Sequence, residues 1–185
     1  CLPNTIKKKY IIFFDAEHKT KMVQNLLNES GLNYTHLYVK TRKPKHAKGV
    51  EQRNMALDWL RNHLSTISDK RGLVFFMDDD NAYAVKIFDE MRKTRRVGVW
   101  PVGIVDGMRV EMPIVQDGKV TGFNAVYKPF RPFPIDMAGF AINATMFLEH
   151  PEAKFSRKVE SGFQVSGSFF FFYSDKIVEK RYCHT

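Results

Sequence analysis

The stretch "YIIFFDAEHKTKMVQNLLNESGLNYTHLYV" (Tyr10–Val39) decides the fold of the first half of the chain. Tyr10–Phe14 is a continuous apolar run of the length of one buried strand, and Tyr34–Val39 alternates as a second strand. Between them a helix is predicted from about Thr20 to Ser30, with Gly31 placed to end it. Its large apolar side chains share one face: Met22, Val23, Leu26 and Leu27. The strand-helix-strand order predicts a right-handed crossover and a parallel sheet.

The alternation of helices and strands continues to about residue 96. A second helix is predicted from Glu51 to Leu64, a strand over Leu73–Met77 and a third helix over Ala84–Lys93. The apolar stripe of the second helix consists of Ala56, Trp59, Leu60 and Leu64. The inward face of the third consists of Val85, Phe88 and Met91. The first half therefore reads as alternating α/β.

The second half changes character and becomes rich in strands. Four runs are predicted as strands: Val97–Val105, Met108–Val115, Lys119–Val126 and, after a proline-rich loop, Met137–Ile142. Asp106-Gly107 and Asp117-Gly118 separate the first three, and both dipeptides are strong hairpin signals. We therefore expect a β-meander joined to the α/β half.

Composition narrows the class of protein. The chain has 185 residues and a formal net charge of +9, which favours an anionic partner. No motif of the nucleic-acid-binding families occurs, so nucleic acid is not expected as that partner. Cys1 and Cys183 stand at opposite ends, which gives no disulfide framework and no zinc knuckle. Sequons for N-glycosylation at Asn28, Asn33 and Asn143 are compatible with the secretory pathway.

Acidic residues follow two of the predicted strands directly. Asp15 ends the first, and the triplet Asp78–Asp80 ends the strand in "GLVFFMDDDN". Because the carboxyl ends of parallel strands form the ligand crevice of such sheets, both should lie on one rim. Carboxylate oxygens suit Mg²⁺ or Mn²⁺, which take their other ligands from substrate phosphates and water. Arg53, at the start of a helix near that rim, can pair with phosphate oxygens.

A second reading of these residues stays open. The aspartates can instead serve the helix that begins near Ala84, because anions are favoured at a helix N-terminus. Arg53 can be an ordinary surface charge. Residue types and spacing alone do not decide between the two readings.

Four longer motifs carry a resemblance: "KGVEQRNMALDWLR" (Lys48–Arg61), "DDDNAYA" (Asp78–Ala84), "MRKTRRVGVWPVG" (Met91–Gly103) and "RPFPIDMAGFAI" (Arg131–Ile142). Together they resemble the animal β-1,3-glucuronosyltransferases, glycosyltransferase family 43, from about Lys9 to Gln164. The resemblance implies an α/β fold with a nucleotide-sugar half of the GT-A, Rossmann-like type and a β-rich acceptor half. It implies an inverting, Mn²⁺-dependent transfer of glucuronic acid from UDP-glucuronic acid to the 3-hydroxyl of a terminal galactose, in the linkage region of proteoglycans.

The same resemblance assigns roles to single residues. Asp80 would be the metal ligand. Asp78 and Asp79 would lie against the nucleotide and donor sugar, with Asp15 on the uracil side and Arg53 on the donor. Three residues of the second half would hold the donor sugar and the acceptor galactose: Glu111, Arg131 and Asp136.

One position departs from the family pattern at the point where chemistry is expected. The family's catalytic base is a glutamate, and Val165 stands at the matching position. Valine cannot accept the proton of an attacking hydroxyl, a contribution of about 10²–10⁴-fold in rate. The alternative to an enzyme is therefore a catalytically inactive protein that only binds UDP-sugar or glycan.

The resemblance also predicts organisation and location. We expect a partial catalytic domain over 1–165, with a donor half (1–96) and an acceptor half (97–165), incomplete at both ends. The phenylalanine-rich segment 166–185 is expected to be a divergent tail. The full-length protein is expected in the Golgi membrane with this domain in the lumen, as a homodimer whose membrane anchor lies outside this chain.

Overall fold

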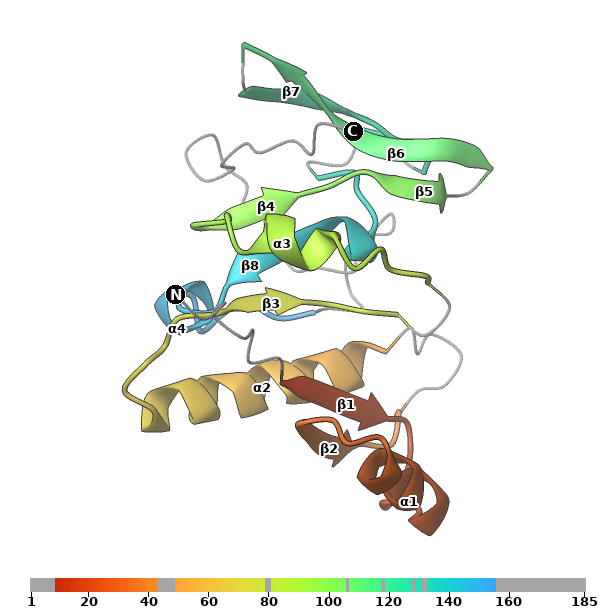
Figure 1. The fold of residues 1–185 in the computed structure, drawn as a ribbon, viewed down its shortest axis with the longest axis vertical. Helices are drawn as coiled ribbons and strands as arrows, with labels where there is room; N and C mark the ends of the chain where they lie inside the picture. Colours follow the sequence, from red (N-terminus) through yellow and green to blue (C-terminus); the bar gives the residue numbers. More distant parts are fainter. Residues whose placement is uncertain are drawn as a thin grey trace.

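The computed structural model describes residues 9–42, 49–78, 81–105, 107–117, 119–127, 129–130 and 133–155. It is a mixed α/β protein with one parallel strand pair and two antiparallel sheets (Figure 1). Among these residues, no helix is both long and apolar enough to cross a bilayer.

The first strand-helix-strand unit is confirmed. β1 (Tyr10–Phe14) pairs in parallel with β2 (Tyr34–Tyr38), and α1 (Lys21–Glu29) connects them. The predicted apolar face of α1 is only partly covered. Leu27 is buried, whereas the side chains of Met22 and Leu26 are 79% and 66% exposed. The apolar stripe is thus wider than the surface that the described part of the chain packs against.

The strand that precedes the aspartate triplet lies in a different sheet from β1. β3 (Leu73–Phe75) and β4 (Val97–Val99) flank β8 (Phe140–Asn143), and both pair with it antiparallel. The prediction that one parallel sheet contains both acidic strand ends is therefore wrong for the described residues, where β1 pairs with β2 alone. An apolar run such as that of β3 has no feature that reveals the direction of its partner.

The hairpin predictions are confirmed. β5 (Val102–Val105), β6 (Met108–Gln116) and β7 (Lys119–Asn124) form an antiparallel sheet in that order. The single strand predicted over 97–105 is instead two strands, β4 and β5, broken at Trp100-Pro101. The N–H of Trp100 donates to the carbonyl of Gly139, and Pro101 has no N–H with which to continue a ladder.

Two further predictions need correction. The strand expected over Met137–Ile142 begins as a 3-10 turn, η2 (Met137–Gly139), before β8. The third helix is shorter than expected. In α3 (Ile87–Met91) Met91 is buried and Phe88 packs on the core, but Val85 lies before the helix and is 76% exposed. A fourth helix, α4 (Met146–Glu149), was not predicted because one turn is too short to show a period.

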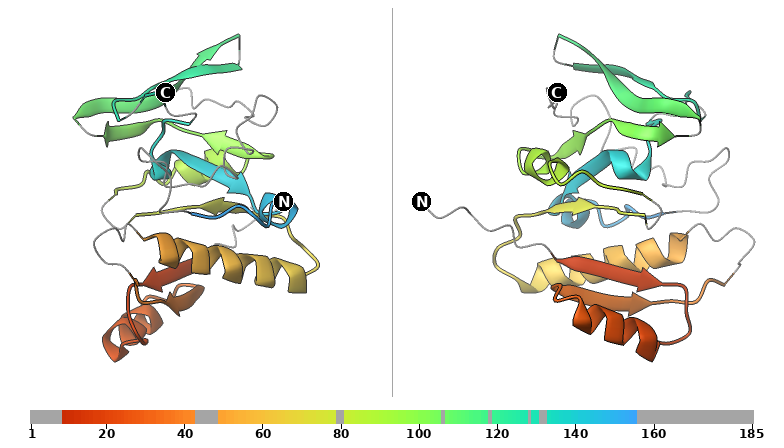
Figure 2. Two further views of the ribbon diagram at one scale, coloured as in Figure 1. Left: turned by 180° about the vertical axis from the view of Figure 1, so that it is seen from behind. Right: turned by 45° about the vertical axis from the view of Figure 1, so that its right-hand side comes forward.

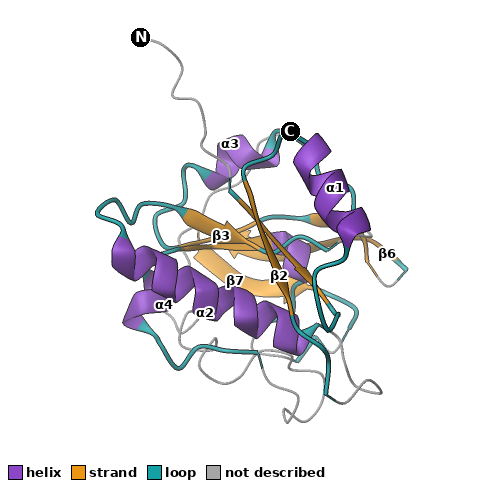
Figure 3. Cartoon of the chain, turned by 90° about the horizontal axis from the view of Figure 1, so that it is seen from below, coloured by secondary structure: helices purple, strands orange, loops and turns teal. Residues whose placement is uncertain are grey.

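The helix α2 (Val50–Thr66) lies between the β1–β2 pair and the β3–β8–β4 sheet (Figures 1 and 2). It contacts both β1 and β2 and packs beside α4, which Figure 3 shows from below. Its predicted stripe is confirmed, and Leu57 adds to it with 1% exposure. The main core joins this stripe to side chains from the β3–β8–β4 sheet and α4, among them Phe76, Val97, Ile142 and Phe147. β1 and β3 both run toward the end of the molecule where α2 begins (Figure 1).

Candidate functional site

An ion pair joins the start of α2 to the loop after β3. One terminal nitrogen of Arg53, Nη2, lies 2.7 Å from Oδ1 of Asp78, and the two side chains are 12% and 32% exposed. Gly49, the N-cap of α2, has a φ of +66°, and a Cβ there would lie 3.0 Å from the Arg53 guanidinium. Glycine therefore both permits the turn and leaves room for the arginine. Asp78 does not cap α3, whose N-cap is Lys86 without a side-chain hydrogen bond.

Tyr83 fixes the loop that contains Asp78. Its hydroxyl accepts the N–H of Asp78 at 2.9 Å and donates to the carbonyl of the same residue at 3.3 Å. Its ring packs edge-on against Phe75 of β3, with 5.6 Å between centroids. Burial raises the pKa of Tyr83, and the negative charges of Asp78 and Asp136 act in the same direction, against the hydrogen bonds of Asp78 and Asn81. Two of the predicted site carboxylates, Asp78 and Asp136, thus both raise the pKa of the Tyr83 hydroxyl.

Asp15 reaches the start of α2 through two hydrogen-bonded residues. Its Oδ1 accepts the N–H of Thr41 at 2.7 Å. Gln52, only 4% exposed, donates to the Thr41 hydroxyl at 3.0 Å and to the carbonyl of Val39 at 3.1 Å. Since Gln52 precedes Arg53, one turn of α2 holds the loops that follow β2 and β3. Asp15 and Asp78 are thus both linked to the start of α2, although the strands that precede them lie in different sheets.

Two predicted site residues of the acceptor half, Asp136 and Glu111, lie on adjoining elements. Asp136 caps η2, because its Oδ1 accepts the N–H of Ala138 at 2.9 Å. Glu111 is 2% exposed on β6, where it pairs in register with Val102 of β5. A Cβ on Gly139 would lie 3.0 Å from the Val102 side chain. The η2 turn therefore packs against the strand next to Glu111.

Four residues singled out in the sequence fall outside the described part: Asp79, Asp80, Arg131 and Val165. The residues that the structure does describe contain no group of three or more histidine, cysteine, aspartate or glutamate side chains that could hold a metal ion. The assignment of Asp80 as a metal ligand stays a prediction.

The model of one protein family matches residues 9–175 of the chain, and this family is described as glycosyltransferase family 43. The chain belongs to glycosyltransferase family 43. The motifs that carried the resemblance are thus those of a family member, and they supply α2, the β3 loop and η2 to the site.

Three named relatives of this family member are similarly close. A galactosylgalactosylxylosylprotein 3-beta-glucuronosyltransferase I from Drosophila melanogaster is 47% identical over 173 residues, covering 85% of this chain and 56% of the relative. The enzymes numbered 1 and 3 from Homo sapiens are 46% and 45% identical, covering 85% and 83% of this chain and 51% of each relative. The chain spans about half the length of the relatives it matches.

Sequence reasoning missed three residues that build this site: Thr41, Gln52 and Tyr83. Gln52 and Tyr83 both lie inside the motifs of the resemblance, at Lys48–Arg61 and Asp78–Ala84. Gln52 could have been found from the sequence, because it is a polar residue on the side of the helix that is buried, and a buried polar side chain needs a hydrogen-bond partner. Nothing in the sequence indicated that the backbone of Thr41 would bind Asp15.

Proposed function

We propose that this chain carries residues of both the donor half and the acceptor half of a β-1,3-glucuronosyltransferase catalytic domain. The reaction is the inverting transfer of glucuronic acid from UDP-glucuronic acid to the 3-hydroxyl of a terminal galactose in the proteoglycan linkage region. Membership of family 43 and the names of the relatives support this proposal. The observation that carries it is the Arg53–Asp78 pair at the start of α2, where Tyr83 holds the backbone of Asp78.

On the donor side, α2 offers a fixed cation beside carboxylates. The guanidinium of Arg53 is planar and presents several N–H donors, of which Nη2 contacts Asp78. The group is mostly buried, so its charge is less screened than that of a surface arginine. Arg53 is expected to bind the donor, and Asp78 and Asp79 are expected to lie against its nucleotide and sugar. Asp15, which is linked to Gln52 through Thr41, is expected to lie near the uracil.

The residues of the β3 loop fit a manganese ion in their chemistry. Three successive carboxylates supply hard oxygen ligands, and Arg53 engages the first of them, Asp78. The resemblance to the family gives the ligand role to Asp80. When bound, Mn²⁺ would offset the charge that develops on the UDP leaving group.

The acceptor side draws on the β-rich half. Glu111 and Asp136 are proposed to hold hydroxyls of the donor sugar and the galactose, together with Arg131. Glu111 lies on β6, beside the β5 strand against which the η2 turn packs. In the transfer, the galactose O3 forms a bond to the anomeric carbon, the bond to the diphosphate oxygen breaks, and UDP leaves with the electron pair.

The proton of the galactose hydroxyl needs an acceptor, and this requirement favours one rival function. Val165 stands at the base position of the family, so the rival is a family member that binds UDP-glucuronic acid without transferring its sugar. The remaining proposals are a Golgi lumenal location and a homodimer for the full-length protein. They are supported by the same family membership.

The test is a titration of the chain with UDP-glucuronic acid in Mn²⁺ and in EDTA, followed by transfer to a galactosyl-galactosyl-xyloside. Binding in Mn²⁺ together with release of UDP supports the enzyme. Binding without acceptor-dependent release supports the non-catalytic rival. Failure to bind the donor, in a protein shown to be folded by its near-UV circular dichroism, would overturn both.

A further inference from the structure

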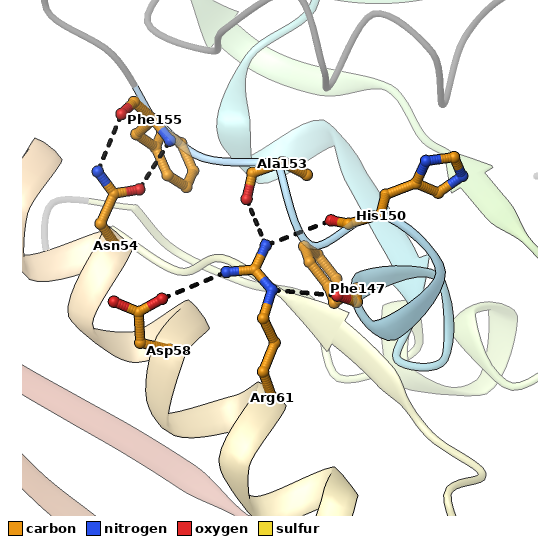
Figure 4. A network of polar contacts seen from close by, with 7 residues as sticks. All are labelled: Asn54, Asp58, Arg61, Phe147, His150, Ala153 and Phe155. Carbon is orange, nitrogen blue, oxygen red and sulfur yellow. Dashed lines mark hydrogen bonds and ion pairs between the residues drawn. The ribbon is translucent and has the colours of Figure 1, made fainter.

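The side-chain amide of Asn54 holds the backbone of a residue 101 positions further along the chain (Figure 4). Its Nδ2 donates to the carbonyl of Phe155 at 2.9 Å, and its Oδ1 accepts the N–H of Phe155 at 2.7 Å. Both polar groups of that peptide position are thus satisfied by one amide, in the way one strand satisfies another. The contact uses the side chain of Asn54 and only backbone atoms of Phe155.

The ring of Phe155 packs against the guanidinium of Arg53 and against Phe76. Phe155 is 2% exposed, and Cζ of Arg53 lies 5.7 Å from its ring centroid. On another side the ring meets Phe76 edge-on, with centroids 5.3 Å apart. Phe76 precedes Asp78 by two residues. The aromatic ring therefore packs under the guanidinium and beside the strand end that supplies its partner carboxylate.

We propose that Asn54 is a positioning residue for the donor site, acting through Phe155 on Arg53. Asn54 fixes the backbone of Phe155 and so fixes the position of its ring. The face of the ring then packs against the guanidinium of Arg53 and keeps that group oriented toward Asp78. An arginine on a flexible stem would otherwise have to be ordered by the ligand at each binding event, at a cost in affinity. The consequence for donor binding rests on the proposed function; the ordering of Arg53 does not.

Arg61 provides a matched control on the same helix. Its guanidinium donates to the carbonyls of Phe147 at 3.1 Å, His150 at 3.5 Å and Ala153, and pairs with Asp58 at 3.4 Å (Figure 4). It therefore fastens the same stretch of chain to α2. It lies eight residues after Arg53, about 12 Å along the helix. Loosening this second contact should lower stability without disordering Arg53.

The first experiment needs no ligand. Arginine side-chain NMR on the full chain measures the rate of rotation of the Arg53 guanidinium about its Nε–Cζ bond in wild type, Asn54→Ala, Phe155→Leu and Arg61→Lys. We expect faster rotation, by about 5-fold or more, in the first two variants and a wild-type rate in Arg61→Lys. Phe155→Leu keeps the backbone contact with Asn54 and removes the ring, so it serves if Asn54→Ala does not fold. Unchanged rotation in a folded Asn54→Ala or Phe155→Leu protein would overturn the proposal.

The second experiment measures donor affinity in a double-mutant cycle. Asn54→Ala should weaken UDP-glucuronic acid binding by about 5- to 20-fold, and by much less when Arg53 is already lysine. Equal factors in both backgrounds would show that Asn54 acts on stability alone, and would overturn its positioning role. If wild type binds no UDP-glucuronic acid, the proposed function fails, while the rotation of Arg53 still decides whether Asn54 orders it.

Discussion

The hydroxyl of Tyr83 closes the loop after β3 by accepting the N–H of Asp78 at 2.9 Å and donating to its carbonyl at 3.3 Å. These two hydrogen bonds connect Tyr83 to Asp78, the first residue of the aspartate triplet. Because Asp78 also pairs with Arg53, one residue receives contacts from α2 and from its own loop. The orientation of the predicted donor site depends on these two contacts.

Removing the hydroxyl of Tyr83 should loosen this loop. Tyr83→Phe keeps the ring against Phe75 but leaves the Asp78 peptide without its partner, which costs about 1–2 kcal/mol of unfolding free energy. Urea denaturation measures the loss. Tyr34→Phe is the control, because its hydroxyl contacts Asn28 at an exposed site, where loss should cost less than about 0.5 kcal/mol. Equal stability of Tyr83→Phe and wild type would contradict the role of the hydroxyl.

Protonation of His36 should destabilise the fold. Burial, with a smaller contribution from the charge of Lys19, lowers the pKa of His36 from its ordinary 6.5. The unfolded state therefore binds the proton more readily, so the stabilising contribution is present above about pH 6.5 and is lost as the pH falls through the folded-state pKa.

Urea denaturation between pH 8 and pH 5 measures this dependence. In His36→Phe, which keeps an aromatic ring beside Phe14, we expect a shallower loss of stability below pH 6.5. As a control, His18→Phe replaces an exposed histidine and leaves the buried His36 in place. A wild-type slope in His36→Phe would show that another group is responsible.

A methyl group at Gly139 should distort the η2 turn. The added Cβ would lie 2.8 Å from Ile135 Cγ1 and 3.0 Å from Val102 Cγ2, so Gly139→Ala should destabilise by about 1–3 kcal/mol. Gly72→Ala offers a control, because its nearest neighbour would lie at an ordinary 3.8 Å. Thermal denaturation compares the two. A Gly139→Ala protein as stable as Gly72→Ala would mean that the turn can shift without cost.

Arg61 should contribute more to stability than any exposed arginine. Arg61→Ala removes a donor from three backbone carbonyls, of which that of His150 keeps the N–H of Ala153, and we expect a loss of about 2–4 kcal/mol of unfolding free energy. Arg71, whose side chain is 91% exposed, pairs with Asp69 at the surface, and Arg71→Ala should leave the stability close to that of wild type. Chemical denaturation separates them. Similar losses in both variants would contradict the role of Arg61 in holding the chain after α4.

The sequence was sufficient wherever contacts are local. The β1–α1–β2 unit, the stripe of α2 and the two hairpins follow from periodicity and turn residues within about 30 positions. The pairing of β3 with β8 could not be predicted, because the two strands are more than 60 residues apart and both are mostly apolar. The link from Asp15 to the start of α2 could not be predicted, because it runs through the backbone of Thr41 and the side chain of Gln52. The Asn54–Phe155 contact leaves no sequence signal, since its acceptor and donor at residue 155 are backbone atoms.

The central claim is that the aspartates after β3, with Arg53, hold UDP-glucuronic acid through a divalent cation. Calorimetric titration of the chain with UDP-glucuronic acid, in Mn²⁺ and in EDTA, tests it most directly when wild type is compared with Asp80→Asn. We predict binding that requires Mn²⁺ and that Asp80→Asn weakens at least about 10-fold, or about 1.4 kcal/mol. An affinity that is the same in Mn²⁺ and EDTA, and the same in both proteins, would contradict the account.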